Sequence, residues 1–185
     1  MKNILGHLKK IIIHKWWVFV YSCKLGIPIQ GLLHDLSKFH PTEFFESVRY
    51  YQGNKSPIPV AKKENGYSKA WQHHKGVNKH HYEYWIDNND DELVLIPIPF
   101  KYVLELLADW YGAARAYNGP DFNYLDELKW WIEKEPKITY MHPATKILIS
   151  RMIKHIEAKG FDFNMKEWNN TYNNIISDIK NAEQK

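Results

Sequence analysis

Apolar residues at helical spacing, separated by glycines and prolines, recur along almost the whole chain. The clearest stretch is residues 100–117, where Val103, Leu106, Leu107 and Trp110 lie on one apolar stripe. The same spacing, with proline at helix starts and glycine at helix ends, predicts further helices over residues 3–25, 28–39, 41–53, 67–75, 79–86, 124–134, 143–159 and 165–182. We find no convincing strand alternation and no internal repeat. The sequence therefore predicts an all-α bundle of about eight helices.

The length of 185 residues suits one domain, which we expect to span residues 1–185 around one hydrophobic core. The residues with recognisable chemistry lie within about residues 7–118. The C-terminal helices, over about residues 121–183, carry apolar stripes that would complete this core. A helix-pair interface in a homodimer is the alternative for these stripes. Residues 54–66 and the acidic run 87–92 are predicted to be exposed loops.

The most apolar stretch, residues 11–21, is interrupted by His14 and Lys15. It falls short of the roughly 18 to 20 apolar residues that a membrane-spanning helix needs, and no signal-peptide cleavage site is evident. The single cysteine, Cys23, excludes an intramolecular disulfide and a thiolate zinc module. These observations predict a cytoplasmic protein without membrane association. The net charge of +4 does not indicate nucleic-acid binding, and no motif supports it.

One aspartate in an apolar helix gives the first sign of a functional site. Asp109 lies within residues 100–117, where an unpaired buried carboxylate would be costly, so a cation is its natural partner. His34 and Asp35 are adjacent, and neighbouring helical side chains point about 100° apart, so this pair can straddle one metal ion or bridge two. The apolar neighbours of His14 indicate that it faces inward, as a ligand or as a core histidine.

Two histidine pairs add to this set, at residues 73–74 and 80–81. We favour His74 over His73, because on a helix His74 would share a face with Asn78 and His81. Imidazole and carboxylate groups are suitable ligands for Fe, Mn, Zn, Co or Ni. The other histidines have simpler interpretations: His7 as peripheral, His40 and His142 as helix-start residues before proline, and His155 as part of a solvated face.

This order of residues resembles the H…HD…H…H…D pattern of the HD-domain superfamily, whose members are all-α, metal-dependent phosphohydrolases. Lys38, three residues after Asp35, matches a lysine that is frequent in that superfamily. More narrowly, the segments HDLSKF, AWQHHKGVNKHHYEYW and ADWYGA resemble an uncharacterised bacterial and phage family with an HHxxxNxHH motif, within or near the superfamily. The resemblance covers about residues 7–118.

The second half of the pattern also resembles the HD-GYP subgroup of cyclic-dinucleotide phosphodiesterases, in which both members of a histidine pair can ligate. The matching residues are His80, His81, Glu83, Pro97, Pro99 and Asp109. Residues 85–91 stand where that subgroup has Gly-Tyr-Pro, so its substrate specificity does not carry over. The resemblance implies one or two divalent transition-metal ions (Fe, Mn, Zn, Co or Ni), held by His14, His34, Asp35, His74, His80, His81 and Asp109.

The function that the resemblance implies is a phosphohydrolase or phosphodiesterase acting on a nucleotide or a related small phosphoester. A metal-activated water would attack phosphorus, with Lys38 stabilising the phosphoryl charge and Asp35 bridging metals or accepting the water's proton. We therefore predict Asp35 and Lys38 as catalytic, and Lys38 and Arg115 as substrate-binding. A surface position is the alternative for Arg115. Trp71, Tyr82, Trp85 and Trp110 would stack on a nucleobase or pack in the core.

Charge supports an anionic substrate, because the first 63 residues hold ten Lys or Arg against three acidic residues. An HD-type di-iron oxygenase acting on a small molecule is the alternative function, since several imidazoles and a bridging aspartate also suit two irons. A binding module with a degenerate site is a third, and the nearly complete ligand set argues against it.

Overall fold

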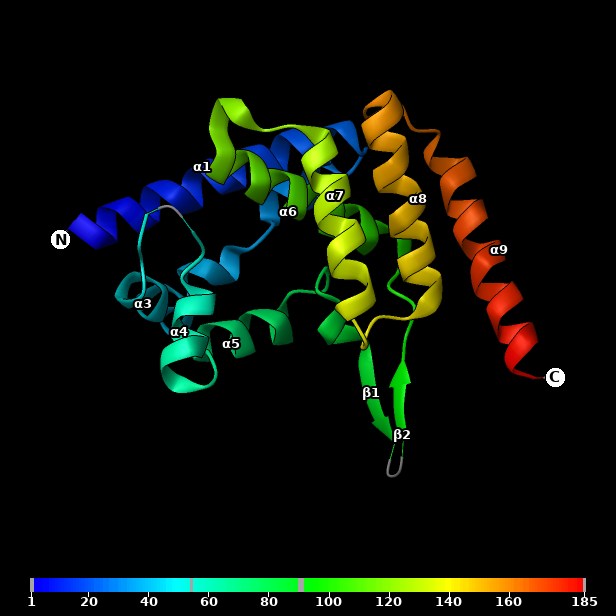
Figure 1. Ribbon diagram of the computed structural model, residues 1–185, viewed down its shortest axis with the longest axis horizontal. Helices are drawn as coiled ribbons and strands as arrows, with labels where there is room; N and C mark the ends of the chain where they lie inside the picture. The colour runs from blue at the N-terminus through cyan, green and yellow to red at the C-terminus, as the bar shows by residue number, and fades with distance from the viewer. Residues whose placement is uncertain (1, 54, 90–91, 185) are drawn as a thin grey trace.

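In the computed structural model, which describes residues 2–53, 55–89 and 92–184, the chain is largely helical (Figure 1). The described elements are α1 (Lys2–Lys24), α2 (Pro28–Leu33), α3 (Pro41–Arg49), α4 (Ile58–Asn65), α5 (Lys69–Val77), β1 (Ile86–Asn89), β2 (Glu92–Leu95), α6 (Phe100–Asn118), α7 (Tyr124–Lys134), α8 (Pro143–Lys159) and α9 (Met165–Glu183), joined in places by short 3₁₀ turns. The predicted all-α fold is confirmed, and one two-stranded hairpin accompanies the helices of the described chain.

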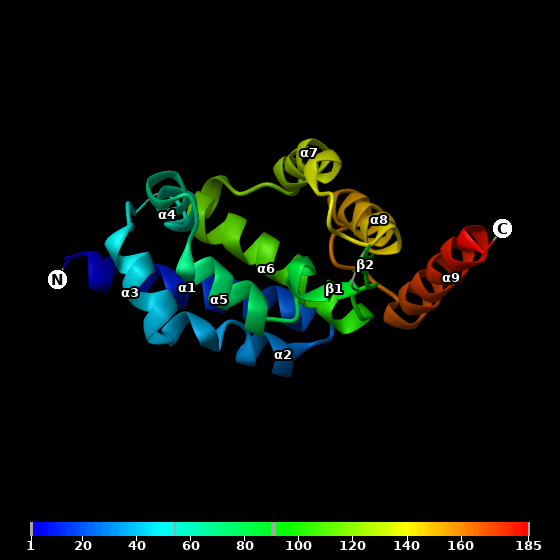
Figure 2. The same ribbon diagram turned by 90° about the horizontal axis from the view of Figure 1, so that it is seen from below.

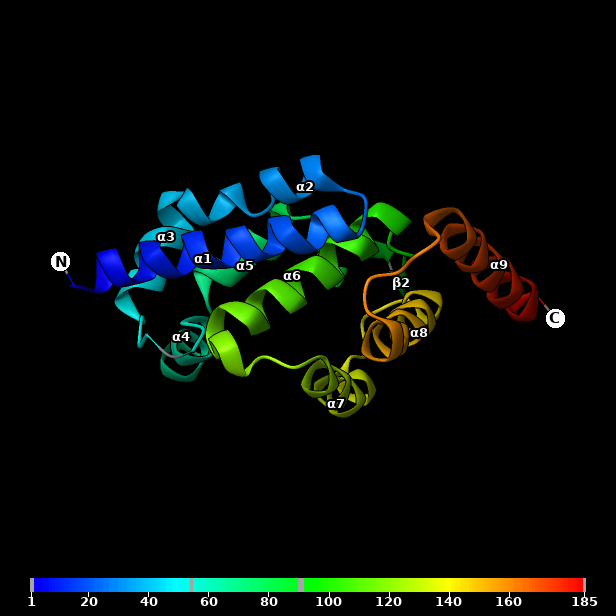
Figure 3. The same cartoon turned by 90° about the horizontal axis from the view of Figure 1, so that it is seen from above.

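Helices α1 and α6 lie side by side along the molecule (Figure 3). They approach closely at Gly112 of α6, where a Cβ atom would lie 2.6 Å from Val18 Cγ2 and 2.8 Å from the Val18 backbone nitrogen of α1. Val18 and Leu107 are completely buried in the main hydrophobic cluster. This close packing brings His14 of α1 opposite Asp109 of α6.

Helices α2, α3 and α5 lie along the same part of the molecule as α1 (Figure 2). Helix α2 packs on α1 where Gly31 meets Ser22. Helix α3 packs against α5, and its Glu46 carboxylate accepts hydrogen bonds from the backbone nitrogens of Lys69 at 3.1 Å and Ala70 at 3.2 Å. A carboxylate at a helix N-terminus satisfies free N–H groups and complements the helix dipole. This contact fixes the start of α5, which carries His74.

The C-terminal helices α7, α8 and α9 occupy the other end of the molecule (Figure 1). Leu148 and Met152 of α8 belong to the same buried cluster as residues of α1 and α6. The Tyr172 hydroxyl of α9 donates to the Ile98 carbonyl at 2.9 Å and contacts the Thr145 hydroxyl at 2.7 Å. The polar groups buried between α8 and α9 are thereby satisfied.

The structure corrects the local predictions in three parts of the chain. Residues 58–65 form α4, although residues 54–66 were predicted as an exposed loop, of which residue 54 lies outside the described residues. Pro57 and Pro59 stand at the helix start, where they cost no hydrogen bond, and Ala61 is buried. The helix predicted over residues 41–53 ends at Arg49.

The second correction concerns the predicted helix over residues 28–39. It is two separate pieces, α2 and a 3₁₀ turn at Leu36–Phe39, with His34 and Asp35 in the link between them. The backbone of Asp35 is left-handed, with φ 53° and ψ 33°, which no α-helix can contain.

The third correction is the hairpin. Residues 82–85 form only a 3₁₀ turn in place of the helix predicted over residues 79–86. The predicted acidic loop over 87–92 overlaps β1 and β2, in register Ile86↔Leu95, with residues 90–91 outside the described residues. β1 is mostly polar and most of β2 is exposed, so the hairpin lacks the alternation of buried apolar and exposed polar residues that would reveal it in the sequence. Along the described part of the chain, no helix has the length and apolar character needed to cross a membrane.

Candidate metal centre

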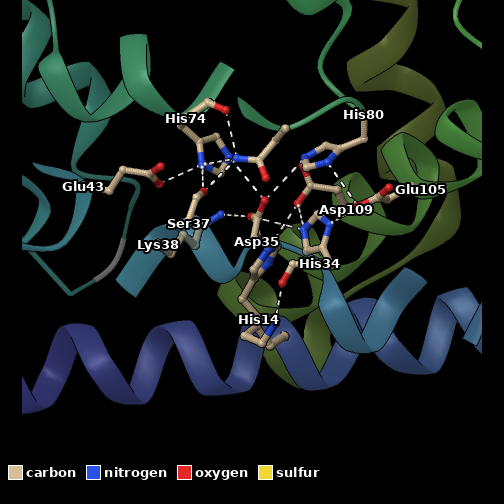
Figure 4. A network of polar contacts seen from close by, with 12 residues as sticks. His14, His34, Asp35, Ser37, Lys38, Glu43, His74, His80, Glu105 and Asp109 are labelled. Atoms are coloured by element: carbon tan, nitrogen blue, oxygen red, sulfur yellow. Dashed lines mark hydrogen bonds and ion pairs between the residues drawn. The ribbon is translucent and has the colours of Figure 1, made fainter. Parts of the chain in front are cut away.

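Five parts of the fold converge on one buried cluster of histidines and carboxylates (Figure 4). Helix α1 supplies His14, the link after α2 supplies His34 and Asp35, and α6 supplies Glu105 and Asp109. Helix α5 supplies His74, and the segment after it supplies His80 and His81. The structure thus brings together all seven residues that the sequence predicted as metal ligands.

The first ligand group contains His14, His34, Asp35 and Asp109. Asp109 Oδ1 lies 3.2 Å from His14 Nε2 and 3.3 Å from His34 Nε2. Asp35 Oδ2 lies 3.1 Å from His34 Nε2 and 3.7 Å from His14 Nε2. Two imidazoles and two carboxylates therefore face one point between α1, α6 and the link after α2.

The second ligand group contains Asp35, His74, His80 and His81. Asp35 Oδ1 lies 3.4 Å from His74 Nε2 and 3.6 Å from His80 Nε2. Asp35 is thus shared, with Oδ2 in the first group and Oδ1 in the second. A carboxylate in this position can bridge two cations.

The backbone at Asp35 makes this arrangement possible. Among the described residues it is the one non-glycine residue with a positive φ. Aspartate tolerates the left-handed region better than most residues, and such strain is retained mainly where the surrounding structure requires it. Here it interrupts the helical direction between α2 and the 3₁₀ turn, and the Asp35 side chain is completely buried in the cluster.

The donor atoms fit a metal ion better than they fit each other. Five buried atoms of the ligand residues have no partner in hydrogen-bond geometry in the described structure: His14 Nε2, His34 Nε2, Asp35 Oδ1, His80 Nε2 and His81 Nε2. Leaving such groups unpaired is costly, so their convergence indicates a missing partner. Ligands at about 2.1 Å from a metal lie about 3.0 Å apart at octahedral and about 3.4 Å apart at tetrahedral angles. Three spacings of the first group, 3.1, 3.2 and 3.3 Å, lie in this range, and the fourth, 3.7 Å between His14 Nε2 and Asp35 Oδ2, is slightly longer.

Two glutamates orient the histidines, and the sequence analysis identified neither. Glu105 Oε1 lies 2.9 Å from His34 Nδ1 and 3.2 Å from His80 Nδ1. Glu43 Oε2 lies 2.8 Å from His74 Nδ1. A carboxylate on one ring nitrogen holds the proton there and leaves the other nitrogen free to bind a metal. The available signal for Glu105 was its position four residues before Asp109 in an apolar helix. Glu43 gave no such signal.

The electrostatics favour ionised carboxylates at Asp35 and Asp109 and a neutral ring at His81, whereas at His34 the neighbouring carboxylates, Asp35 first, outweigh burial and raise its pKa well above its usual value. Burial raises the pKa of Asp35, but His34, Lys38 and His74 outweigh it and hold that pKa well below its usual value. Contacts with His14 and His34 likewise outweigh burial and hold the pKa of Asp109 well below its usual value. Burial and the neighbouring His80 and His74 lower the pKa of His81 well below its usual value. The ionised carboxylate and the neutral imidazole are the forms of these side chains that bind metals.

A cavity of about 200 Å³ opens beside the ligands and includes Lys38 in its lining. The Lys38 ammonium also contacts the Asp35 carboxylate. Arg115 does not line this cavity: its guanidinium lies 4.9 Å from the centre of the Trp17 ring and 5.5 Å from that of Phe122. The structure thus places Lys38, but not Arg115, in the cavity beside the ligands.

The remaining histidines occupy varied positions. His73 lies outside both ligand groups, with Nδ1 2.7 Å from Glu43 Oε1. His7, expected to be peripheral, is buried and lines the cavity, because α1 directs it toward Phe44 of α3. His40 and His142 cap the starts of α3 and α8, as predicted. His155 is half-buried and contacts the Asp162 carbonyl at 2.6 Å, rather than lying on a solvated face.

The four aromatic residues that the sequence places near the ligands fall into two groups, one in the cavity and one in the hydrophobic core. Trp71 lines the cavity and contacts the His81 ring edge-on at 4.9 Å between ring centres. Tyr82, Trp85 and Trp110 pack against the hydrophobic core and do not line the cavity. Among these four residues, only Trp71 is placed to contact a molecule bound beside the ligands.

No curated protein and no solved structure matches the chain. One family model matches residues 3–155, a range that includes every predicted ligand from His14 to Asp109 as well as Glu43 and Glu105. This range covers most of the chain, and the protein accordingly belongs to the family of unknown function DUF5662.

Proposed function

We propose that the protein is a metal-dependent phosphohydrolase of the HD type, acting on a nucleotide or a related phosphoester. The observation that carries this proposal is Asp35, whose two carboxylate oxygens face two separate ligand groups. Such a site suits two divalent ions a few ångströms apart, the arrangement that many phosphoester-cleaving enzymes use. The order of the ligands along the chain, which resembles the HD-domain superfamily, supports the same assignment.

Divalent ions at this site would supply Lewis-acid activation of a water molecule and of the phosphoryl group. The seven ligand residues would hold such ions, while Glu105 and Glu43 keep the Nε2 atoms of His34, His80 and His74 directed inward. In the hydrolysis, the water oxygen forms a bond to phosphorus and the bond from phosphorus to the alcohol oxygen breaks. The leaving oxygen takes up a proton, and the products are phosphate and the alcohol.

Lys38 has two contacts that suit this reaction. Its ammonium contacts Asp35, and its side chain lines the cavity in which a substrate would bind. A cation at this position stabilises the negative charge on the phosphoryl oxygens. The Asp35 carboxylate belongs to both ligand groups and can accept the proton of the attacking water.

Metal analysis and a phosphatase assay test the proposal. Wild-type protein reconstituted with Mn²⁺, Co²⁺ or Zn²⁺ should bind up to two ions and release phosphate from some members of a panel of nucleotides and simpler phosphoesters. Asp35→Asn keeps the size of the side chain and tolerates the left-handed backbone, and it should lose both metal and activity. Asp178→Asn, at an exposed position of α9, is the matched control. Failure of the wild-type protein to take up any transition metal would overturn the proposal.

A di-iron oxygenase is the second candidate, because the five imidazoles of the two ligand groups also suit iron. The two functions differ in their products. Oxygen consumption by the iron-loaded protein, without phosphate release from any ester, would favour the oxygenase. Phosphate release with Mn²⁺ or Co²⁺ and no oxygen consumption would favour the phosphohydrolase.

A further inference from the structure

The cavity beside the metal centre differs strongly between its two ends. At the inner end its lining consists of the ligands His14, His74, His81 and Asp109, together with Lys38. Away from them, four helices contribute apolar and aromatic side chains: Ile11 from α1, Ile58 from α4, Ala70 and Trp71 from α5, and Ala113 and Tyr117 from α6. A molecule bound here would place its charged group at the ligands and its organic group among these side chains.

Three polar side chains along the outer part of the lining, Lys10, Ser56 and His7, already have a partner or carry no charge. The Lys10 ammonium donates to the Ala116 carbonyl at 3.0 Å and lies over the Tyr117 ring at 4.7 Å. The Ser56 hydroxyl accepts a hydrogen bond from the Ile58 backbone nitrogen at 3.4 Å. Burial lowers the pKa of His7 to about 4, so its ring is neutral at physiological pH. The outer part of the cavity therefore offers few groups that could form hydrogen bonds with a hydroxyl-rich ligand.

The size of the cavity limits the organic group further. A cavity of about 150 Å³ accommodates a benzene ring, and sites for drug-sized ligands measure about 300–1,000 Å³. The 200 Å³ available here also has to admit part of the phosphate. A single ring or a short branched chain fits these limits, whereas a nucleoside adds a polar sugar to a base.

We infer that the metal centre acts on phosphomonoesters of compact apolar or aromatic alcohols, whose organic group occupies the cavity between Ile11, Ile58, Trp71 and Tyr117. This inference rests on the proposed function for the chemistry of the inner end, and within that function it selects simple phosphomonoesters over nucleotides. The apolar group would add affinity by displacing water from the lining. One methylene group in such a pocket changes specificity by about 10- to 200-fold, so a phenyl group should gain at least about tenfold over a methyl group.

A pair of non-hydrolysable ligands tests the cavity separately from the reaction. Phenylphosphonate and methylphosphonate share the same charged group and differ only in the organic group. Calorimetry on the full chain loaded with Mn²⁺ or Zn²⁺ should show phenylphosphonate binding at least about tenfold more tightly. Ala113→Leu, which fills the cavity, should abolish this preference and keep the affinity for methylphosphonate. Ala114→Leu, next to it on α6 but outside the lining, should keep the preference.

A second variant covers the case in which Ala113→Leu fails to fold. Tyr117→Ala at the half-exposed rim removes an aromatic wall and should reduce the preference about threefold or more. Hydrolysis supplies an independent measurement, because kcat/KM for phenyl phosphate should exceed that for glycerol phosphate and adenosine monophosphate.

The outcomes separate the two proposals. A preference for phenylphosphonate without phosphate release from any ester would overturn the phosphohydrolase and leave the cavity inference standing. Phosphate release with equal binding of the two phosphonates, or with adenosine monophosphate as the better substrate, would overturn the cavity inference and leave the phosphohydrolase standing. If neither phosphonate binds the metal-loaded protein, the cavity inference is wrong.

Discussion

Glu105 contacts one histidine from each ligand group, so replacing it should weaken both groups at once. One of its oxygens lies 2.9 Å from His34 Nδ1 and 3.2 Å from His80 Nδ1. Its other oxygen accepts a hydrogen bond from the Gln30 side-chain amide. The contacts with both histidines hold the pKa of Glu105 at about 2 despite its burial, so the group is a carboxylate at neutral pH.

Glu105→Gln keeps the shape of the side chain and changes only its hydrogen-bonding capacity and charge. If the amide NH₂ faces the two histidines, each Nδ1 must accept a hydrogen bond, and the ring proton moves to Nε2, where it blocks metal binding. If the amide oxygen faces them, the NH₂ group meets the donor of Gln30, and the negative charge is still lost. Loss of such an orienting partner costs about 10- to 100-fold in metal affinity, equivalent to about 1.4 to 2.7 kcal/mol.

Competition against a chromogenic zinc chelator at pH 7.5 measures this loss directly. Glu133→Gln, at an exposed position of α7, is the matched control and should bind zinc like the wild type. Circular dichroism and a thermal unfolding curve verify that each variant is folded. If folded Glu105→Gln binds zinc within a factor of two of wild type, the orienting role of Glu105 is refuted.

Four further predictions concern stability. Gly112→Ala should destabilise the fold by about 1–3 kcal/mol, because the new Cβ would lie 2.6 Å from Val18. Gly76→Ala, with no atom within 4 Å of the new Cβ, should instead gain about 0.5–1 kcal/mol in urea unfolding. Burial and Asp126 raise the pKa of Glu127 to about 7. Because this raised pKa disfavours the ionised form, the folded state loses stability as pH rises from about 4.5 to 7. Glu127→Gln removes this cost. After a discount for partial exposure, thermal melts should show the variant to be more stable than the wild type by about 1–2 kcal/mol at pH 8 and by little at pH 4.5. Chelation of a tightly bound metal should lower the unfolding temperature, since ligand at 100 times its Kd stabilises by about 2.7 kcal/mol; an unchanged temperature would contradict binding to the folded state.

The sequence predicted most helices because each one combines an apolar stripe with proline or glycine at its ends. Helix α4 escaped prediction because Pro57, Pro59 and a lysine-rich segment are equally typical of loops. The hairpin was not predicted because β1 is mostly polar. Its strands pair through the backbone, and no local sequence pattern reveals that pairing. The break at Asp35 was hidden by a helical apolar pattern on both sides of it.

The ligand residues could be predicted because they are unusual residue types in unusual places, such as Asp109 in an apolar helix. The orienting glutamates could not be found in this way. Glu43 follows a proline at a helix start, where an acidic residue is ordinary, and only the packing of α3 against α5 brings it to His73 and His74. Its role is a product of tertiary structure.

The charge within the cluster gives these separate observations a common cause. Asp35, Asp109, Glu105 and Glu43 place four carboxylates in one largely buried region, and Lys38 is the nearest ammonium. Burying four negative charges against one positive charge is unfavourable unless further cations bind. Glu105 and Glu43 contact the Nδ1 atoms of His34, His80 and His74, so the Nε2 atoms of these rings face the centre, where a metal ion or further protons can supply the remaining positive charge. An arrangement that needs positive charge and directs lone pairs to its centre is one that a divalent cation completes.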